Sequence, residues 1–194
     1  MISISVHGEI RNELGKKASK DIRNSGTIPC VLYGGDQPIH FTTTQKMVKD
    51  LVYTPDFKVA EIEIGGKITR AILKEVQYHP VTDEIMHIDF LRLVNGTSVK
   101  VDLPVRFRGS SPGVKLGGKL IQNLRKVKVK TFPENLVDQV VVDISTMELG
   151  QSIRVRDIDK NEGVEIMNSP GIPIATIEIP RAMRSAATTA AKSK

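Results

Sequence analysis

Apolar and polar residues alternate along most of this chain, and a period of two is the pattern of a half-buried β-strand. In the first stretch, one side of the strand is apolar and the other is polar: Ile2, Ile4, Val6 and Ile10 against Ser3, Ser5, His7 and Glu9. Similar stretches predict further strands over residues 27–33, 57–64, 67–78, 85–94, 99–107, 125–132, 139–144, 151–158 and 174–179. The pattern therefore predicts a mostly β protein.

Local signals indicate how some of these strands are connected. Gly65-Gly66 separate two alternating runs, and glycine tolerates the positive φ of a tight hairpin turn, so strands 57–64 and 67–78 should be antiparallel neighbours. Two short helices, predicted over residues 17–26 and 43–52, would cover open parts of a small barrel.

Composition shifts suggest where the chain divides. The turn-rich "VNGTS" at 94–98 interrupts the strands and predicts two domains, 1–94 and 95–180. The end of the chain, 181–194, is small, polar and basic, and we expect a mobile tail there because it has little apolar content.

Composition also limits the class of function. No apolar run approaches the roughly 20 residues of a membrane helix, which predicts a cytoplasmic protein without a membrane partner. Cys30, the single cysteine, lies in an apolar run and is expected to be a buried thiol. The net charge of +6 favours a polyanionic partner. Residues 1–94 nevertheless carry twelve basic and twelve acidic side chains, so nucleic acid could bind there only through a local cluster.

One such cluster lies in "RNELGKKASKDIR", residues 11–23. Its basic residues outnumber Glu13 and Asp21 by three: Arg11, Lys16, Lys17, Lys20 and Arg23. A helix beginning near Ala18 would direct its free N–H groups toward a bound phosphate. An ordinary solvated surface gives the same pattern. Tyr33, which ends a strand in "VLYGG", is equally open to two interpretations, a nucleic-acid contact or a core residue with an exposed hydroxyl.

A second cluster, "QYHPVTDEIMHIDF" at 77–90, crowds histidines and acids together. Alternation places His87 and Asp89 on one strand face, opposite Met86, Ile88 and Phe90, and one plausible register sets Gln77 across from His87. His79, His87 and Asp89 could be proposed as metal ligands, but their spacing matches no closed zinc pattern.

No catalytic motif supports chemistry at this second cluster, because the chain lacks H-E-x-x-H, G-x-S-x-G and a phosphate-binding glycine loop. The polar patch formed by Gln77, His79, His87 and Asp89 could hydrogen-bond base edges and 2′-hydroxyls in the wide minor groove of RNA. An ordinary exposed sheet face has the same composition.

The second half contains a basic run without a single acid between Asp102 and Glu134. Its members could make one wall of the domain positive: Arg106, Arg108, Lys115, Lys119, Arg125, Lys126, Lys128 and Lys130. This favours an anionic neighbour. The aromatic content of 4% argues against a base-stacking platform of the RRM kind.

Four segments resemble successive blocks of one known family: "RNELGKKASKDIRNSGTIPCVLYGG", "KEVQYHPVTDEIMHIDFLRL", "VDLPVRFRGSSPGVKLGGKL" and "VDQVVVDISTMELGQSIRVRDI". The family is the bacterial large-subunit ribosomal protein that binds 5S ribosomal RNA, in the longer two-domain form called general stress protein Ctc. The resemblance covers residues 1–180 in order. It implies an N-terminal six-stranded β-barrel that docks on the loop E region of 5S RNA, followed by a β-rich second domain.

The resemblance also implies a set of RNA-facing positions: Arg11, Lys16, Ser19, Lys20, Arg23, Tyr33, Gln77, His79, His87 and Asp89. One position departs from the family, which usually has two consecutive basic residues where this chain has Lys20-Asp21. Because an acid beside a phosphate repels it, either Asp21 faces solvent or one contact is lost.

The leading hypothesis is a structural, non-enzymatic protein of the bacterial 50S subunit, with no catalytic residue, metal or cofactor. Its expected partners are 5S rRNA and, through the second domain, neighbouring rRNA or protein, and off the ribosome it should be a monomer. Two alternatives stay open. One is a metal-dependent hydrolase using His79, His87 and Asp89, and the other is a stress-induced RNA-binding module acting off the ribosome.

Overall fold

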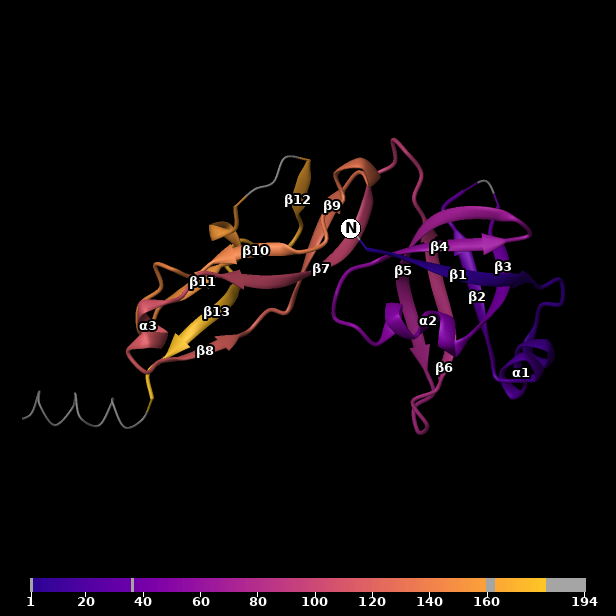
Figure 1. Ribbon diagram of the computed structural model, residues 1–194, viewed down its shortest axis with the longest axis horizontal. Helices are drawn as coiled ribbons and strands as arrows, with labels where there is room; N and C mark the ends of the chain where they lie inside the picture. The colour runs from indigo at the N-terminus through magenta and orange to yellow at the C-terminus, as the bar shows by residue number, and fades with distance from the viewer. Residues whose placement is uncertain (1, 36, 160–162, 181–194) are drawn as a thin grey trace, which may run out of the picture. The chain divides into compact units, whose positions relative to one another are not determined.

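A computed structural model of the chain describes residues 2–35, 37–159 and 163–180. The chain divides into two compact units, and each is considered by itself (Figure 1). One unit comprises the residues up to 101 together with 131–138, and the other comprises 102–130 and the residues from 139 onward. The predicted tail, 181–194, lies outside the described residues.

Six strands of the first unit close into a barrel with the neighbour order β1-β3-β2-β6-β5-β4. The strands are β1 (Ser3–Ile10), β2 (Thr27–Tyr33), β3 (Ile39–Thr44), β4 (Val59–Ile64), β5 (Lys67–Tyr78) and β6 (Ile85–Arg92). The β1/β4 and β2/β6 pairs are parallel, and the other four pairs are antiparallel. The mostly β class and the six-stranded barrel are therefore confirmed.

The hairpin predicted at the two glycines joins β4 to β5. Gly65 and Gly66 adopt φ values of 57° and 77°, and Ile64 pairs with Lys67 across the turn. Strand β3 was not predicted, because the third of its inward positions is Thr43, a polar residue. The Thr43 hydroxyl donates a 2.9 Å hydrogen bond to the backbone oxygen of His7, which allows it to be buried.

The barrel interior is filled by apolar side chains and closed by helix α2 (Gln45–Val52). Val48 and Leu51 of α2 are buried in the same core cluster as Phe41 and Phe90, whose ring centroids lie 5.9 Å apart. The expectation that a helix covers part of the barrel is confirmed for α2. Helix α1 (Lys16–Asn24) differs, because it buries no residue fully and lies beside β2.

The second unit contains two sheets, with neighbour orders β10-β7-β9-β12 and β11-β13-β8. Their strands are β7 (Val99–Arg108), which begins in the first unit, β8 (Lys119–Gln122), β9 (Lys126–Thr131), β10 (Val140–Asp143), β11 (Ser152–Arg154), β12 (Val164–Ile166) and β13 (Pro173–Glu178). The unit also contains two short helical turns, α3 (Pro112–Lys115) and η2 (Val155–Asp157), whereas a third, η1 (Pro133–Asn135), belongs to the first unit. Strands β8 and β12 were not predicted.

The single strand predicted over 151–158 is wrong, because the chain leaves β11 and turns into η2. The carboxylate of Asp157 accepts a 2.8 Å hydrogen bond from the backbone N–H of Arg154, which stabilises the turn. In the same unit, the buried hydroxyl of Ser111 donates to the Met147 backbone oxygen at 2.6 Å and so anchors α3. Among the described residues, no helix is long and apolar enough to cross a membrane.

Candidate nucleic-acid interface

The polar patch on β5 and β6 depends on an irregularity in the pairing of these strands. Gln77 lies directly across from His87, as predicted, and Glu75 lies across from Asp89. The register shifts between Leu73 and Glu75, so that one extra residue is accommodated in β5. This bulge reverses which residues face outward, and it brings Glu75 and Gln77 to the same outer face as the His87–Asp89 pair.

A second bulge places Met86 outside the barrel core. The register shifts again after Gln77, and Tyr78 pairs with Ile85 while Met86 is skipped. Ile85 is 6% exposed and belongs to the core cluster, whereas Met86 is only partly buried. The prediction that Met86 lies on the same strand face as Ile88 and Phe90 is therefore wrong, because alternation cannot detect an inserted residue.

The two histidines of the patch are held by different contacts. Nδ1 of His87 lies 2.8 Å from Oδ1 of Asp89, so Nδ1 carries a proton and, in the neutral ring, Nε2 is left as an acceptor. Nδ1 of His79 instead accepts hydrogen bonds from the backbone N–H groups of Val81 and Thr82, at 3.4 and 3.2 Å. Its proton therefore lies on Nε2. The patch thus offers a hydrogen-bond acceptor at Nε2 of His87 and a donor at Nε2 of His79.

Tyr33 lies close to the two carboxylates of this face. In the parallel pairing of β2 with β6, Val31 is opposite Asp89 and Tyr33 is opposite Leu91. Burial raises the pKa of the Tyr33 phenol, and the nearby charges of Asp89 and Glu75 raise it further. The phenol therefore stays neutral at physiological pH and can donate as well as accept a hydrogen bond.

Helix α1 presents most of its basic residues on one side. At about 100° per residue, Lys16, Lys20 and Arg23 fall within roughly 60° of one another around the helix axis, while Lys17 and Asp21 are adjacent on a different side. Asp21 is exposed and lines a shallow groove on another side of α1 from Lys20 and Arg23. The acid that departs from the family therefore lies on a different side of α1 from Lys20 and Arg23.

Arg11 is engaged within the protein. Its Nη1 donates a 3.3 Å hydrogen bond to the hydroxyl of Ser19, and its backbone N–H donates to the His40 oxygen on β3. Its Nε is buried without a hydrogen-bond partner in the structure. These contacts join the segment after β1 to both β3 and α1, so Arg11 and Ser19 position the basic helix against the barrel.

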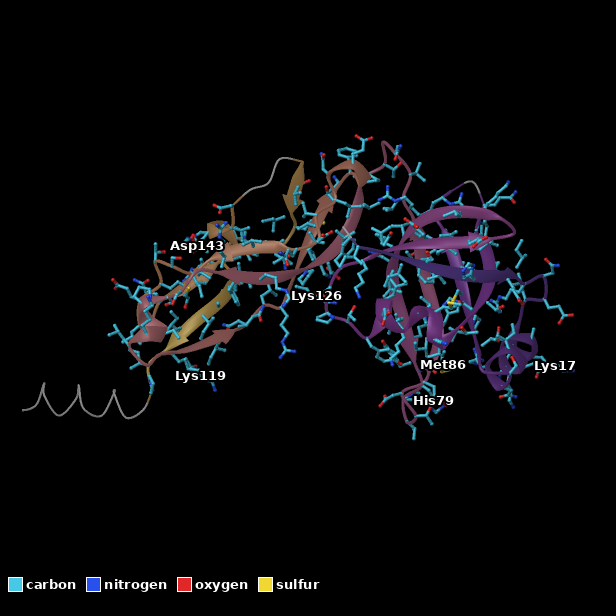
Figure 2. The ribbon with its side chains drawn as sticks, viewed as in Figure 1. Lys17, His79, Met86, Lys119, Lys126 and Asp143 are labelled. Carbon is cyan, nitrogen blue, oxygen red and sulfur yellow. The ribbon has the colours of Figure 1, made fainter. Side chains whose placement is uncertain are left out.

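A groove brings the two sequence clusters together. It lies between α1 and the β5–β6 turn and has a volume of about 380 Å³. Lys20 and Arg23 line one side, His79 and Met86 line the other, and Figure 2 shows the latter two at the end of the β5–β6 hairpin. Residues more than fifty positions apart in the sequence therefore form one continuous surface.

His40 and Glu75 also lie on the outer face of this sheet, and neither could be selected from the sequence. His40 pairs with Val31 on β3, and its Nδ1 is buried without a hydrogen-bond partner. It was missed because β3 itself was not predicted. Glu75 was missed because its outward direction depends on the β5 bulge.

The same geometry argues against a metal centre. No group of three or more His, Cys, Asp or Glu side chains capable of holding a metal ion occurs among the described residues. His87 and Asp89 bind each other, whereas His79 is used to stabilise its own turn. His79, His87 and Asp89, the residues named for the hydrolase alternative, therefore do not form a group that could hold a metal ion.

In the second unit, five members of the basic run are exposed at alternating positions of two neighbouring strands, β7 and β9: Arg106, Arg108, Lys126, Lys128 and Lys130. This face also carries acids. Asp143 pairs with Arg108 in register, and Glu165 lies 3.9 Å from Lys130. The pKa of Asp143 is lowered by hydrogen bonds from the Ser145 side chain and backbone, and by Arg108. The face is therefore basic, but acidic side chains interrupt its positive charge.

Comparison with known proteins identifies both units. Residues 6–90 match the family model of the ribosomal L25p family, and residues 98–181 match that of the ribosomal protein TL5 C-terminal domain. The large ribosomal subunit protein bL25 of Cytophaga hutchinsonii is 40% identical over 192 residues, which cover 99% of this chain and 100% of that protein. Those of Amoebophilus asiaticus and Phocaeicola vulgatus are 41% and 38% identical, with at least 95% of every chain covered.

The barrel, its basic and polar face, and both family matches define a ribosomal protein of bacteria. More narrowly, the chain belongs to the bL25 family of the large ribosomal subunit, in its two-domain form. Members of this family are structural, non-enzymatic, ribosome-associated components, so the expected class of function and the cytoplasmic location are confirmed.

Proposed function

We propose that this protein binds 5S rRNA at its loop E region through the domain formed by residues 1–94, as a structural component of the large ribosomal subunit. The observation that supports the proposal best is the continuity of the surface. The basic side of α1, the groove and the polar face of β5 and β6 adjoin one another on the first unit. An RNA helix binds to such a surface through its phosphates on one side and its minor groove on the other.

The parts of this surface have different roles in the proposal. Lys16, Lys20 and Arg23 hold phosphates, and the unoccupied N–H groups at the start of α1 assist them, since no side chain caps this end. Lys17 contributes to the general positive field from a neighbouring side. Arg11 and Ser19 position the helix.

The strand residues discriminate between RNA structures through hydrogen bonds. They are Tyr33, Gln77, His79, His87 and Asp89. Carboxylates such as Asp89 repel phosphates, so we expect this part of the surface to meet base edges and 2′-hydroxyl groups, which can donate to it. An RNA helix with a wide, accessible minor groove is the partner that fits.

The domain formed by residues 95–180 contacts neighbouring rRNA or protein in this proposal. The exposed cations of β7 and β9 are the candidate contacts. Because Asp143 and Glu165 interrupt them, we expect this face to contribute less to the affinity for free RNA than α1 does.

The test is a mobility-shift titration of the full chain with 5S rRNA, and with a control 5S rRNA in which loop E is replaced by an ordinary Watson–Crick helix. We expect tight binding to the first RNA only, with a log–log salt slope of roughly −3 to −4 from about four phosphate contacts. Equal affinity for both RNAs would contradict binding at loop E, and a slope near zero would contradict a phosphate-binding surface.

A further inference from the structure

The groove between α1 and the β5–β6 turn combines an apolar floor with a basic rim. Ile28 and Ile85 are 4% and 6% exposed, so little of them is accessible, whereas the bulge in β6 leaves Met86 partly exposed in the groove. Lys20 and Arg23 on α1 form the basic side. Met86 is half-buried and does not belong to the core cluster of the barrel.

The polar groups around this floor supply both donors and acceptors. His79 carries a proton on Nε2, since its Nδ1 accepts from the turn. Glu84 uses one carboxylate oxygen, Oε2, to accept from the Thr82 hydroxyl. Asn24 and Gln45 add amide groups at the ends of α1 and α2. The groove therefore has a small apolar surface at Met86, a cationic side and mixed hydrogen-bonding groups.

We propose that this groove takes one unpaired nucleotide of the bound RNA, with its base against Met86 and its phosphate beside Lys20 and Arg23. This inference rests on the proposed function and adds to it a site for a single base outside the helical stack. Unstacked bases are bound in proteins on flat side chains or guanidinium planes, with hydrogen bonds to their edges. A thioether is polarisable and adapts to an aromatic ring.

The size and charge of the groove favour this occupant over others. A volume of about 380 Å³ lies in the range of pockets for small ligands. A base pair inside a helix cannot enter, because its faces are covered by its neighbours in the stack. A metal ion lacks ligands, since the described residues contain no group of three His, Cys, Asp or Glu that could hold one.

The site can be observed directly through the methionine methyl groups. The full chain, labelled with ¹³C at its methionine methyls, is titrated with 5S rRNA, and Met86→Leu assigns the Met86 signal. We expect the Met86 methyl resonance to move upfield in the complex, because a methyl group over the face of a base is shielded by its ring current. Met47, which is 40% exposed on α2 and does not line the groove, provides the control signal and should stay in place.

The affinity of two matched variants completes the test. Met86→Ala should weaken 5S rRNA binding about fivefold to tenfold, near the lower end of what one stacked base contributes, and Met47→Ala should leave it unchanged. If the complex forms with its full salt dependence but the Met86 signal does not move and Met86→Ala binds normally, the nucleotide site is refuted while 5S binding stands. If no complex forms at all, the proposed function and this inference fall together.

Discussion

The basic side of α1 allows a sharp prediction, because the helix carries two exposed lysines that differ only in direction. Lys20 lines the groove beside Arg23, whereas Lys17 lies on the neighbouring side with Asp21. We expect Lys20→Gln to weaken the salt dependence of RNA binding and Lys17→Gln to leave it nearly unchanged. Both changes remove one positive charge from the same helix, and glutamine and lysine have similar helix propensities.

The magnitude follows from counterion release. Each phosphate contact contributes about 0.7 to 0.9 to the slope of log K against log salt, so Lys20→Gln should make the slope shallower by that amount. In the triple variant Lys16→Gln, Lys20→Gln and Arg23→Gln, the magnitude of this slope should decrease by about 2 to 3. Between 50 and 200 mM salt, the affinity of the wild type should therefore fall about 20- to 40-fold more than that of the triple variant.

The assay is fluorescence anisotropy of labelled 5S rRNA over that range of salt, with circular dichroism melting curves to show that each variant is folded. All of the substituted side chains except Arg23 are exposed, so we expect the melting temperatures to change little. Equal flattening of the slope by Lys17→Gln and Lys20→Gln would refute the reasoning. It would mean that the helix acts as a diffuse charge and that the direction of its side chains is irrelevant.

Three further predictions test the patch and the core. Asp89→Ala removes the acceptor that orients His87. Since hydrogen bonds to charged groups contribute about 1.5 to 3 kcal/mol, this change should weaken 5S rRNA binding about 10- to 150-fold in a mobility-shift titration, and unchanged binding would contradict the role of the pair. Gly8→Ala would place a methyl group against the buried ring of Phe41 and should lower the free energy of unfolding in urea by about 1 to 3 kcal/mol, with partial recovery on adding Phe41→Leu. Burial raises the pKa of the Cys30 thiol, so mass spectrometry should detect alkylation by iodoacetamide in urea but not in the folded protein at pH 8, and rapid native labelling would show that the thiol is accessible.

Much of the first unit could be predicted from local sequence, because the signals involved act between near neighbours. Two adjacent glycines select a tight turn, and the β4–β5 hairpin forms there. His87 and Asp89 are two residues apart without an insertion between them, so alternation places them on one face, where they bind each other. The basic cluster likewise forms a helix that ends before Gly26.

The sequence was least informative where a strand departs from strict alternation or is stabilised by a distant partner. Thr43 is polar and yet buried, because its hydroxyl donates a hydrogen bond to the backbone of His7 on another strand. Since alternation does not reveal this hydrogen bond, β3 has too few apolar positions to be recognised from the sequence. Asp157 ends β11 by accepting from Arg154, a contact that alternation does not reveal.

The sequence by itself therefore determined the mostly β class, the hairpin, the basic helix and the placement of His87 and Asp89 on one strand face. Only the tertiary structure decided that Glu75 faces outward and that Met86 leaves the core, since each depends on a bulge, and the pairing of β5 with β6 skips one residue in each strand. It also decided that Lys20 and His79 share one groove. Local patterns fix the direction of a side chain within its own element, whereas the closure of the barrel fixes which elements become neighbours.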